Sequence, residues 1–141
     1  MRTVRNARKI LVLVLTVTVL AGCKQLEPIG RIRGRVTFQG KPVTEGLVVF
    51  SNTQKGVFMT AAIDKDRNYV VTSAAGPGIP LGQYQVTVTP PIDEPKLGPN
   101  FEPPPIKSFP NIPGRYRDVK TSDLSLEVKE GDNLFNVQMK P

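Results

Sequence analysis

Few residues of this 141-residue chain are suited to chemistry, and their types exclude most catalytic mechanisms. The chain has no histidine and a single cysteine, Cys23. Histidine is the commonest general base and the commonest metal ligand, and an internal disulfide needs two cysteines. A Ser-His-Asp triad, a Cys-His pair and a standard zinc site are therefore excluded. We also find no pair of carboxylates suited to acid–base catalysis. We expect no catalytic residues, no metal and no cofactor, so the chain is predicted not to be an enzyme.

The cysteine lies at the end of a segment with the features of a leader. Residues 1–9 are basic and carry no acid, and residues 10–20 form an apolar run. As a helix these eleven residues would rise about 16 Å, which is too short for a hydrocarbon core of roughly 30 Å. The run has instead the length of a signal-peptide core. Leu20, Ala21, Gly22 and Cys23 resemble the lipobox of bacterial lipoproteins.

This resemblance implies a cellular location for the protein. The signal peptide, residues 1–22, would be cleaved between Gly22 and Cys23, and the Cys23 thiol would carry the lipid. Several acyl chains anchor a protein stably, because each buried methylene contributes about 0.8 kcal/mol. The expected partner is thus a membrane of the cell envelope, and Lys24 after the cysteine favours the outer membrane, facing the periplasm. The alternative is an ordinary secretory signal with a chance cysteine.

The segments that follow the leader are predicted to be strands. Residues 23–29 form a short lipidated tether, and residues 30–141 form one domain. Seven segments alternate apolar and polar residues, or are short and apolar, between turn residues; they are residues 30–38, 46–51, 56–63, 69–72, 83–89, 124–128 and 134–139. This pattern predicts an all-β, about seven-stranded antiparallel β-sandwich. The first two strands are expected to pair as a hairpin, or to be neighbours across a short loop.

A proline-rich loop interrupts the predicted sandwich at residues 90–113. It holds nine prolines in 24 residues, and proline cannot donate to a sheet. Loops of this length tend to be functional or disordered. Phe101 and Phe109, together with Ile106 and Ile112, would be its apolar anchors, either for a partner or for folding back onto the sandwich.

Two clusters of polar residues are candidate binding sites. Asp64, Asp66 and Asn68 have the spacing of a calcium loop, but no distal glutamate follows, so at most a weak site is expected. The alternative is a solvated turn.

Arg31, Arg33 and Arg35 alternate along the first strand, which begins seven residues after the anchor, and would form a positive stripe. The stripe could meet anionic headgroups or an acidic polymer. The alternatives are a solubilising face or an edge strand protected by its charge.

The net charge of +7 does not indicate a nucleic-acid partner. Four of the 19 basic residues lie in the leader, which leaves 15 basic against 12 acidic residues in the mature chain, or about +3. Nucleic-acid binding needs a basic patch on the folded domain, and only the short arginine row is present.

The mature chain resembles the transthyretin-like or carboxypeptidase-regulatory-like β-sandwich of bacterial envelope proteins. The matching segments are 34–43, 64–69 and 80–88. Tail residues 112–113, 116–118, 121–122 and 128–133 resemble small envelope lipoproteins with this domain. Arg67-Asn68 stands where the family's turn more often has glycine, and asparagine tolerates the left-handed conformation. The resemblance implies a fold and an envelope setting. Family members that hydrolyse a ring substrate use histidines, so that activity is not implied here.

These observations predict a membrane-anchored envelope lipoprotein whose non-catalytic β-sandwich is an interaction or structural module. Its partner would be an envelope protein or a polysaccharide. The alternative is a carbohydrate-binding module, but the chain offers no tryptophan and only Tyr69, Tyr84 and Tyr116 as aromatic platforms.

Substitution of the lipobox cysteine tests the predicted anchor. We expect Cys23→Ser to abolish metabolic labelling with a radioactive fatty acid and to leave an unprocessed precursor, because no thiol remains to accept the lipid. Labelling and maturation at the wild-type level would contradict the lipoprotein assignment.

Overall fold

The computed structural model describes residues 27–141 apart from residue 75 and residues 93–106. Gly22, Cys23, Phe101 and Ile106 therefore lie outside the described residues. Within the described part, the only helical element is a single 3₁₀ turn, η1 (Gly114–Tyr116). No helix in this part of the chain has the length and apolar character needed to cross a membrane.

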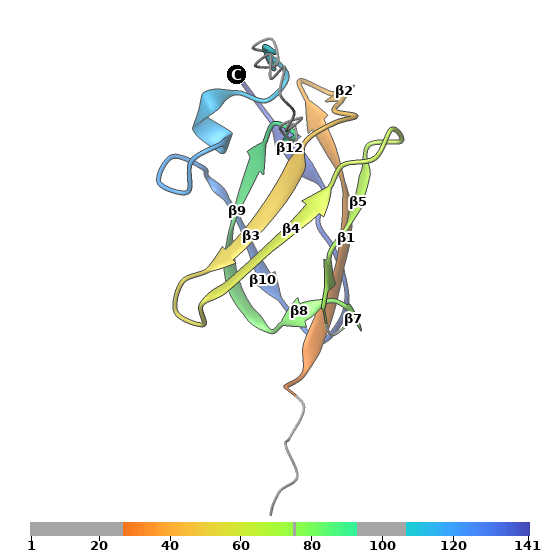
Figure 1. The fold of residues 1–141 in the computed structure, drawn as a ribbon, viewed down its shortest axis with the longest axis vertical. Helices are drawn as coiled ribbons and strands as arrows, with labels where there is room; N and C mark the ends of the chain where they lie inside the picture. The colour runs from red at the N-terminus through yellow and green to blue at the C-terminus, as the bar shows by residue number, and fades with distance from the viewer. Residues whose placement is uncertain (1–26, 75, 93–106) are drawn as a thin grey trace, which may run out of the picture.

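The described chain is otherwise built from strands, as the alternation of its side chains predicts (Figure 1). The strands are β1 (Ile29–Phe38), β2 (Lys41–Pro42), β3 (Leu47–Asn52), β4 (Val57–Ala62), β5 (Asn68–Val70), β6 (Thr72–Ser73), β7 (Gly76–Pro77), β8 (Ile79–Pro80), β9 (Gly82–Thr89), β10 (Leu124–Val128), β11 (Gly131–Leu134) and β12 (Val137–Met139). The all-β prediction is confirmed, and each of the seven predicted segments contains a strand. The additional strands, β2, β6, β7 and β8, are short, and they lie between the predicted segments except for β6, which begins at the last residue of the segment 69–72.

Strand β1 is the centre of the first sheet, and both of its edges are paired. On one edge it pairs antiparallel with β8, β5 and β2 in succession, and on the other it pairs parallel with β11 and β12. This sheet is therefore mixed, whereas the sequence predicts antiparallel pairing throughout. The parallel pairs arise because β10 belongs to the other sheet, and a two-residue link carries the chain from β10 across to β11 in the direction of β1.

The second sheet has the order β10-β9-β3-β4 and is antiparallel throughout. The predicted pairing of residues 30–38 with residues 46–51 is wrong, because β1 and β3 belong to different sheets. After β1 the chain turns back at Gln39 and Gly40, both at positive φ, and β2 pairs with the end of β1. The buried Val43 then leads the chain across to β3.

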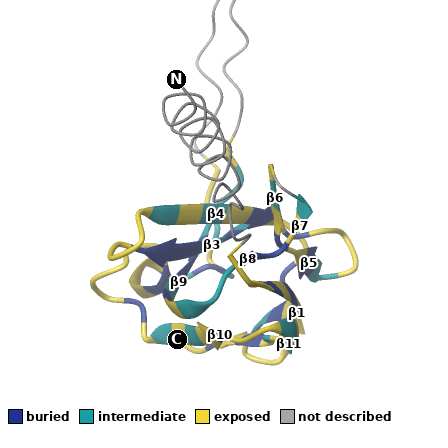
Figure 2. Ribbon diagram, turned by 90° about the horizontal axis from the view of Figure 1, so that it is seen from below, coloured by how far each residue is buried: buried dark blue, intermediate teal, exposed yellow. Residues whose placement is uncertain are grey.

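The core is formed by buried residues from both sheets, and Figure 2 marks the buried residues in dark blue along the strands. Phe50 and Val48 of β3 stand opposite Val86 and Val88 of β9, and all four are fully buried. Tyr84 is also fully buried, and its hydroxyl donates to the Pro80 carbonyl at 2.8 Å. A tyrosine that bonds back to the chain just upstream in this way fixes a strand corner in β-sandwiches.

The last predicted strand, residues 134–139, is interrupted in its middle. Phe135 and Asn136 separate β11 from β12, and β11 extends back to Gly131, where the sequence predicts a turn. The Phe135 N–H donates to the Arg33 carbonyl at 2.9 Å, and the Asn136 side-chain oxygen accepts the Arg35 N–H at 3.1 Å. A side chain thus replaces a backbone carbonyl in the ladder, so the chain remains bonded to β1 across the interruption.

This interruption is possible because Gly34 lies beneath it. A Cβ at Gly34 would overlap the Phe135 carbonyl, which also accepts a hydrogen bond from the Tyr69 hydroxyl. The backbones of Gly34 and Phe135 cannot move apart unless hydrogen bonds of both segments break.

We therefore expect Gly34→Ala to lower the free energy of unfolding by about 1–3 kcal/mol, the usual cost of overpacking. The matched control is Gly114→Ala, since no atom lies within 4 Å of the place that its added methyl group would take, and the change should stay within about 0.5 kcal/mol. Urea denaturation of both variants measures the difference. Equal midpoints would show that Gly34 is not required by the close contact.

Candidate functional site

The outward face of β1 carries the three arginines of the predicted stripe. Burial alternates strictly from Ile29 to Val36, so that Arg31, Arg33 and Arg35 are exposed while the residues between them are buried. Because β1 is paired on both edges, it needs no charge to prevent edge-to-edge association. The edge-protection alternative is thereby removed for these arginines.

The three arginines have different surroundings. The Arg31 Nε lies 3.0 Å from an Asp132 carboxylate oxygen, so its charge is paired. The Arg35 Nε donates to the Asn68 side-chain oxygen at 3.2 Å, which is a neutral partner. The Arg33 guanidinium forms no ion pair or hydrogen bond with any described residue. Two of the three positive charges therefore have no neutralising carboxylate in the described part of the protein.

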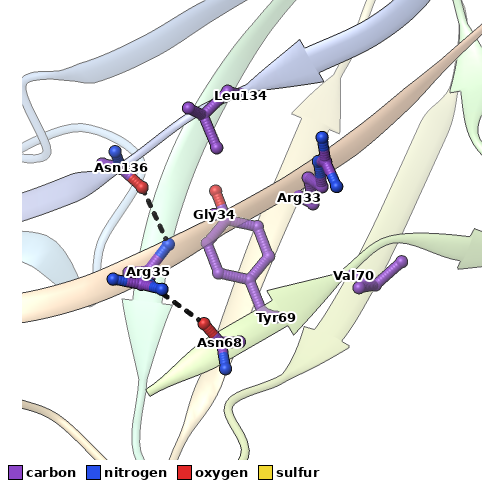
Figure 3. Close-up of a pocket in the computed structure, with 8 residues that line it drawn as sticks. All are labelled: Arg33, Gly34, Arg35, Asn68, Tyr69, Val70, Leu134 and Asn136. Carbon is purple, nitrogen blue, oxygen red and sulfur yellow. Dashed lines mark hydrogen bonds between the residues drawn. The ribbon is translucent and has the colours of Figure 1, made fainter. Parts of the chain in front are cut away.

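A hollow of about 470 Å³ surrounds these two charges (Figure 3). The register of the sheet places Val70 of β5 and Leu134 of β11 on either side of Arg33. These apolar side chains are 58% and 70% exposed, and they form an apolar rim. The side chains of Asn68 and Asn136 lie on either side of Arg35 in the same way.

The hydrogen bonds of the two asparagines fix which of their atoms remain available. Asn136 accepts from the Arg35 backbone N–H, and Asn68 accepts from the Arg35 Nε, so both side-chain oxygens are engaged. Each amide therefore keeps its NH₂ group as a free donor. Together with the two guanidinium groups, the hollow presents donors and positive charge. This is the chemistry that recognises a carboxylate, a phosphate or a sulfate.

A second hollow of about 380 Å³ adjoins the first, since Arg35 and Asn68 line both. Its other lining residues come from the end of β2, from the crossing that follows it and from the turn before β5, and they are Pro42, Thr44, Lys65, Asp66 and Arg67. We call these two adjacent hollows the arginine groove. Its cations are Arg33, Arg35, Lys65 and Arg67, and Asp66 is the carboxylate among its lining residues.

The candidate calcium residues lie in the turn that borders the groove. The Asp64 side chain accepts the Asn68 N–H at 2.8 Å, and the Asn68 oxygen is engaged by Arg35. Two of the three proposed ligands thus stabilise the turn, and a guanidinium lies beside them. Among the described residues no three acidic, histidine or cysteine side chains are grouped for a metal ion. Weak calcium binding remains a prediction that these contacts do not favour.

The left-handed residue of this turn is Arg67, at φ 65°, and not Asn68 as the family resemblance suggested. Asn68 already belongs to β5 and pairs with Arg35, which requires an extended backbone. The positive φ therefore falls on the residue before it, whose N–H donates to the Asp64 carbonyl at 2.9 Å. A non-glycine residue in this conformation costs about 1 kcal/mol.

The end of the proline-rich loop folds back onto the sandwich, which is one of the two alternatives that the sequence leaves open. Phe109 is partly buried against the core, and Ile112 is fully buried within it. The Arg117 guanidinium donates to the carbonyls of both residues, at 2.9 Å to Phe109 and at 2.6 Å and 2.9 Å to Ile112. The Phe109 ring is therefore engaged by the protein's own core, and Phe101 lies outside the described residues.

The tyrosines are not available as platforms for a sugar ring. Tyr69, Tyr84 and Tyr116 are each at most 2% exposed. Burial also raises the pKa of Tyr69, so its hydroxyl stays protonated and donates to the Phe135 carbonyl. Stacking of neutral sugars on tyrosine is thus unsupported, and the charged groove is the feature that could select a ligand.

Comparison of the chain with protein-family models, with curated proteins and with solved structures found no match. The assignment of a role to the arginine groove therefore rests on its own geometry and charge.

The turn at Arg67 gives a test of the strain described above. We expect Arg67→Gly to leave the free energy of unfolding unchanged or to raise it by up to about 1 kcal/mol, because glycine adopts positive φ without strain. Lys65→Gly is the matched control, since its backbone is not at positive φ and glycine should cost about 0.5–1 kcal/mol there. Urea denaturation of both variants separates the effects. A loss of stability in Arg67→Gly as large as that in the control would show that the arginine is not strained.

Proposed function

We propose that this chain is a lipid-anchored lipoprotein of the cell envelope whose non-catalytic β-sandwich binds an envelope partner through the arginine groove. The observation that carries the proposal is the pair of exposed, un-neutralised arginines, Arg33 and Arg35, within a donor-lined hollow. Neither guanidinium forms an ion pair with a described residue, so their charge is available to a partner.

The scaffold beneath the groove supports a binding role. Arg33 and Arg35 belong to a strand that is bonded along both edges, and Arg35 is held further by Asn68 and Asn136. The backbone of both residues and the Arg35 side chain are therefore held in place, which reduces the entropy lost when a ligand binds.

The expected anchor would hold the groove near a membrane. Twelve residues separate Cys23 from Arg35, and even a fully extended chain of that length spans only about 40 Å. A partner would therefore be a component of the envelope within that distance of the bilayer. The absence of histidine from the sequence supports a binding role over a hydrolytic one.

Membership of the transthyretin-like family is part of this proposal. The three motifs that suggested it lie in β1, in the turn before β5 and at the tyrosine corner that begins β9. Each motif therefore occupies a point where the chain direction or the register of a strand is set.

Site-specific photocrosslinking in intact cells tests the proposed interface. Leu134→p-benzoylphenylalanine places a crosslinker on the exposed rim of the groove while every cation is kept. The matched control is the same substitution at Thr60, which is exposed on β4 in the other sheet. We expect a discrete adduct from position 134 and none from position 60. Equal adducts from both positions, or none from position 134, would contradict a binding role for this face.

A further inference from the structure

We infer that the arginine groove binds an acidic polysaccharide, a chain of sugars that carry carboxylates. This inference rests on the proposed function, because it identifies the class of partner that the groove takes. It follows from four features of the groove: its donor chemistry, its length, its apolar rim and the unpaired charge of Arg67.

The donor chemistry selects a ligand rich in acceptors. The Asn68 and Asn136 oxygens are both engaged by Arg35, so the amides offer only NH₂ groups toward the hollow. Guanidinium groups bind carboxylates through paired hydrogen bonds. The hydroxyl and ring oxygens of a sugar accept from neutral amides. A uronic-acid chain supplies both kinds of acceptor side by side.

The length of the groove favours a polymer over a single small anion. Arg35 and Asn68 line both hollows, and the cations of the groove extend from Arg33 on β1 to Lys65 and Arg67 in the turn before β5. Arg33 and Arg35 are two residues apart on one strand, so their Cα atoms lie about 7 Å apart. A series of positive charges along a groove matches a chain with repeated negative charges.

Apolar side chains border the groove and suit the faces of sugar rings. Arg33 lies between the exposed side chains of Val70 and Leu134. The C–H faces of a polysaccharide's sugar rings could pack against this rim while its carboxylates reach the arginines.

Arg67 adds a further unpaired positive charge to the second hollow. Glycine would adopt φ 65° without strain, yet an arginine occupies the position and its side chain lines the second hollow. Its guanidinium forms no ion pair or hydrogen bond with any described residue. Backbone strain of this kind is often kept at functional sites. Because the Arg67 guanidinium makes no polar contact with the described part of the fold, ligand binding would explain an arginine at this position.

Calorimetric titration of the lipidated full-length mature protein in neutral detergent tests the inference, with oligogalacturonate as the probe. We expect binding that weakens as salt is added, because the contacts are ionic. We expect Arg67→Gly and Asn136→Asp each to weaken it at least fivefold. Asn136→Asp keeps the oxygen that accepts the Arg35 N–H but replaces the free donor with a negative charge.

Arg115→Gln is the matched control for loss of a positive charge, since Arg115 is paired with Asp123 and lines neither hollow. Its affinity should equal that of the wild type. Neutral dextran should not bind.

Three results would overturn the inference. The first is wild-type affinity in Arg67→Gly, and the second is an equal loss in Arg115→Gln. The third is no binding of the wild type to oligogalacturonate, and groove-dependent binding to phosphatidylglycerol vesicles in that case would identify a lipid headgroup as the partner instead. If the crosslink from position 134 is nevertheless found in cells, the proposed function stands with a different partner. If that crosslink is also absent, both proposals fail.

Discussion

Strand β1 exchanges backbone hydrogen bonds along both edges, and every other part of the fold is placed relative to it. Three strands pair with one edge and two with the other, so its register is over-determined. A slip of one residue would turn Arg33 and Arg35 into the core and Ile32 and Val36 into solvent. The same constraint that closes the core therefore holds two arginines on the surface. The candidate site is a consequence of the way the sheet is paired.

Core and groove are joined most closely at Gly34. On the inner side of β1, the missing side chain lets the Phe135 backbone approach and accept the Tyr69 hydroxyl. On the outer side, the same interruption brings Asn136 onto the Arg35 N–H. The interruption at Phe135 and Asn136 thus keeps the backbone hydrogen-bonded and gives the buried Tyr69 hydroxyl an acceptor. It also places the Asn136 NH₂ group in the groove. A regular strand over residues 134–139 would have left that amide without this role.

The turn before β5 contributes the other half of the groove, and it does so at a cost in backbone strain. Asp64 stabilises the turn through both its carbonyl and its carboxylate, which accept the N–H groups of Arg67 and Asn68. These hydrogen bonds hold Arg67 in a conformation that glycine would adopt more easily. Strong local bonding therefore permits a charged side chain at a position where the backbone disfavours one. Asp64, one of the two acidic residues that suggested calcium, has a structural explanation in the same bonds.

Much of the fold, and part of the site, could be predicted because side-chain alternation is a local property. The sequence alone determined where the main strands lie, that Arg31, Arg33 and Arg35 share a face, and that histidine chemistry is absent. It could not determine that β1 is central, that β11 and β12 run parallel to it, or that Asn136 contacts Arg35 from 101 residues away. Those features depend on long-range pairing, and no periodicity within a strand specifies its partner. The tertiary structure alone decided that a stripe of charges would become a groove.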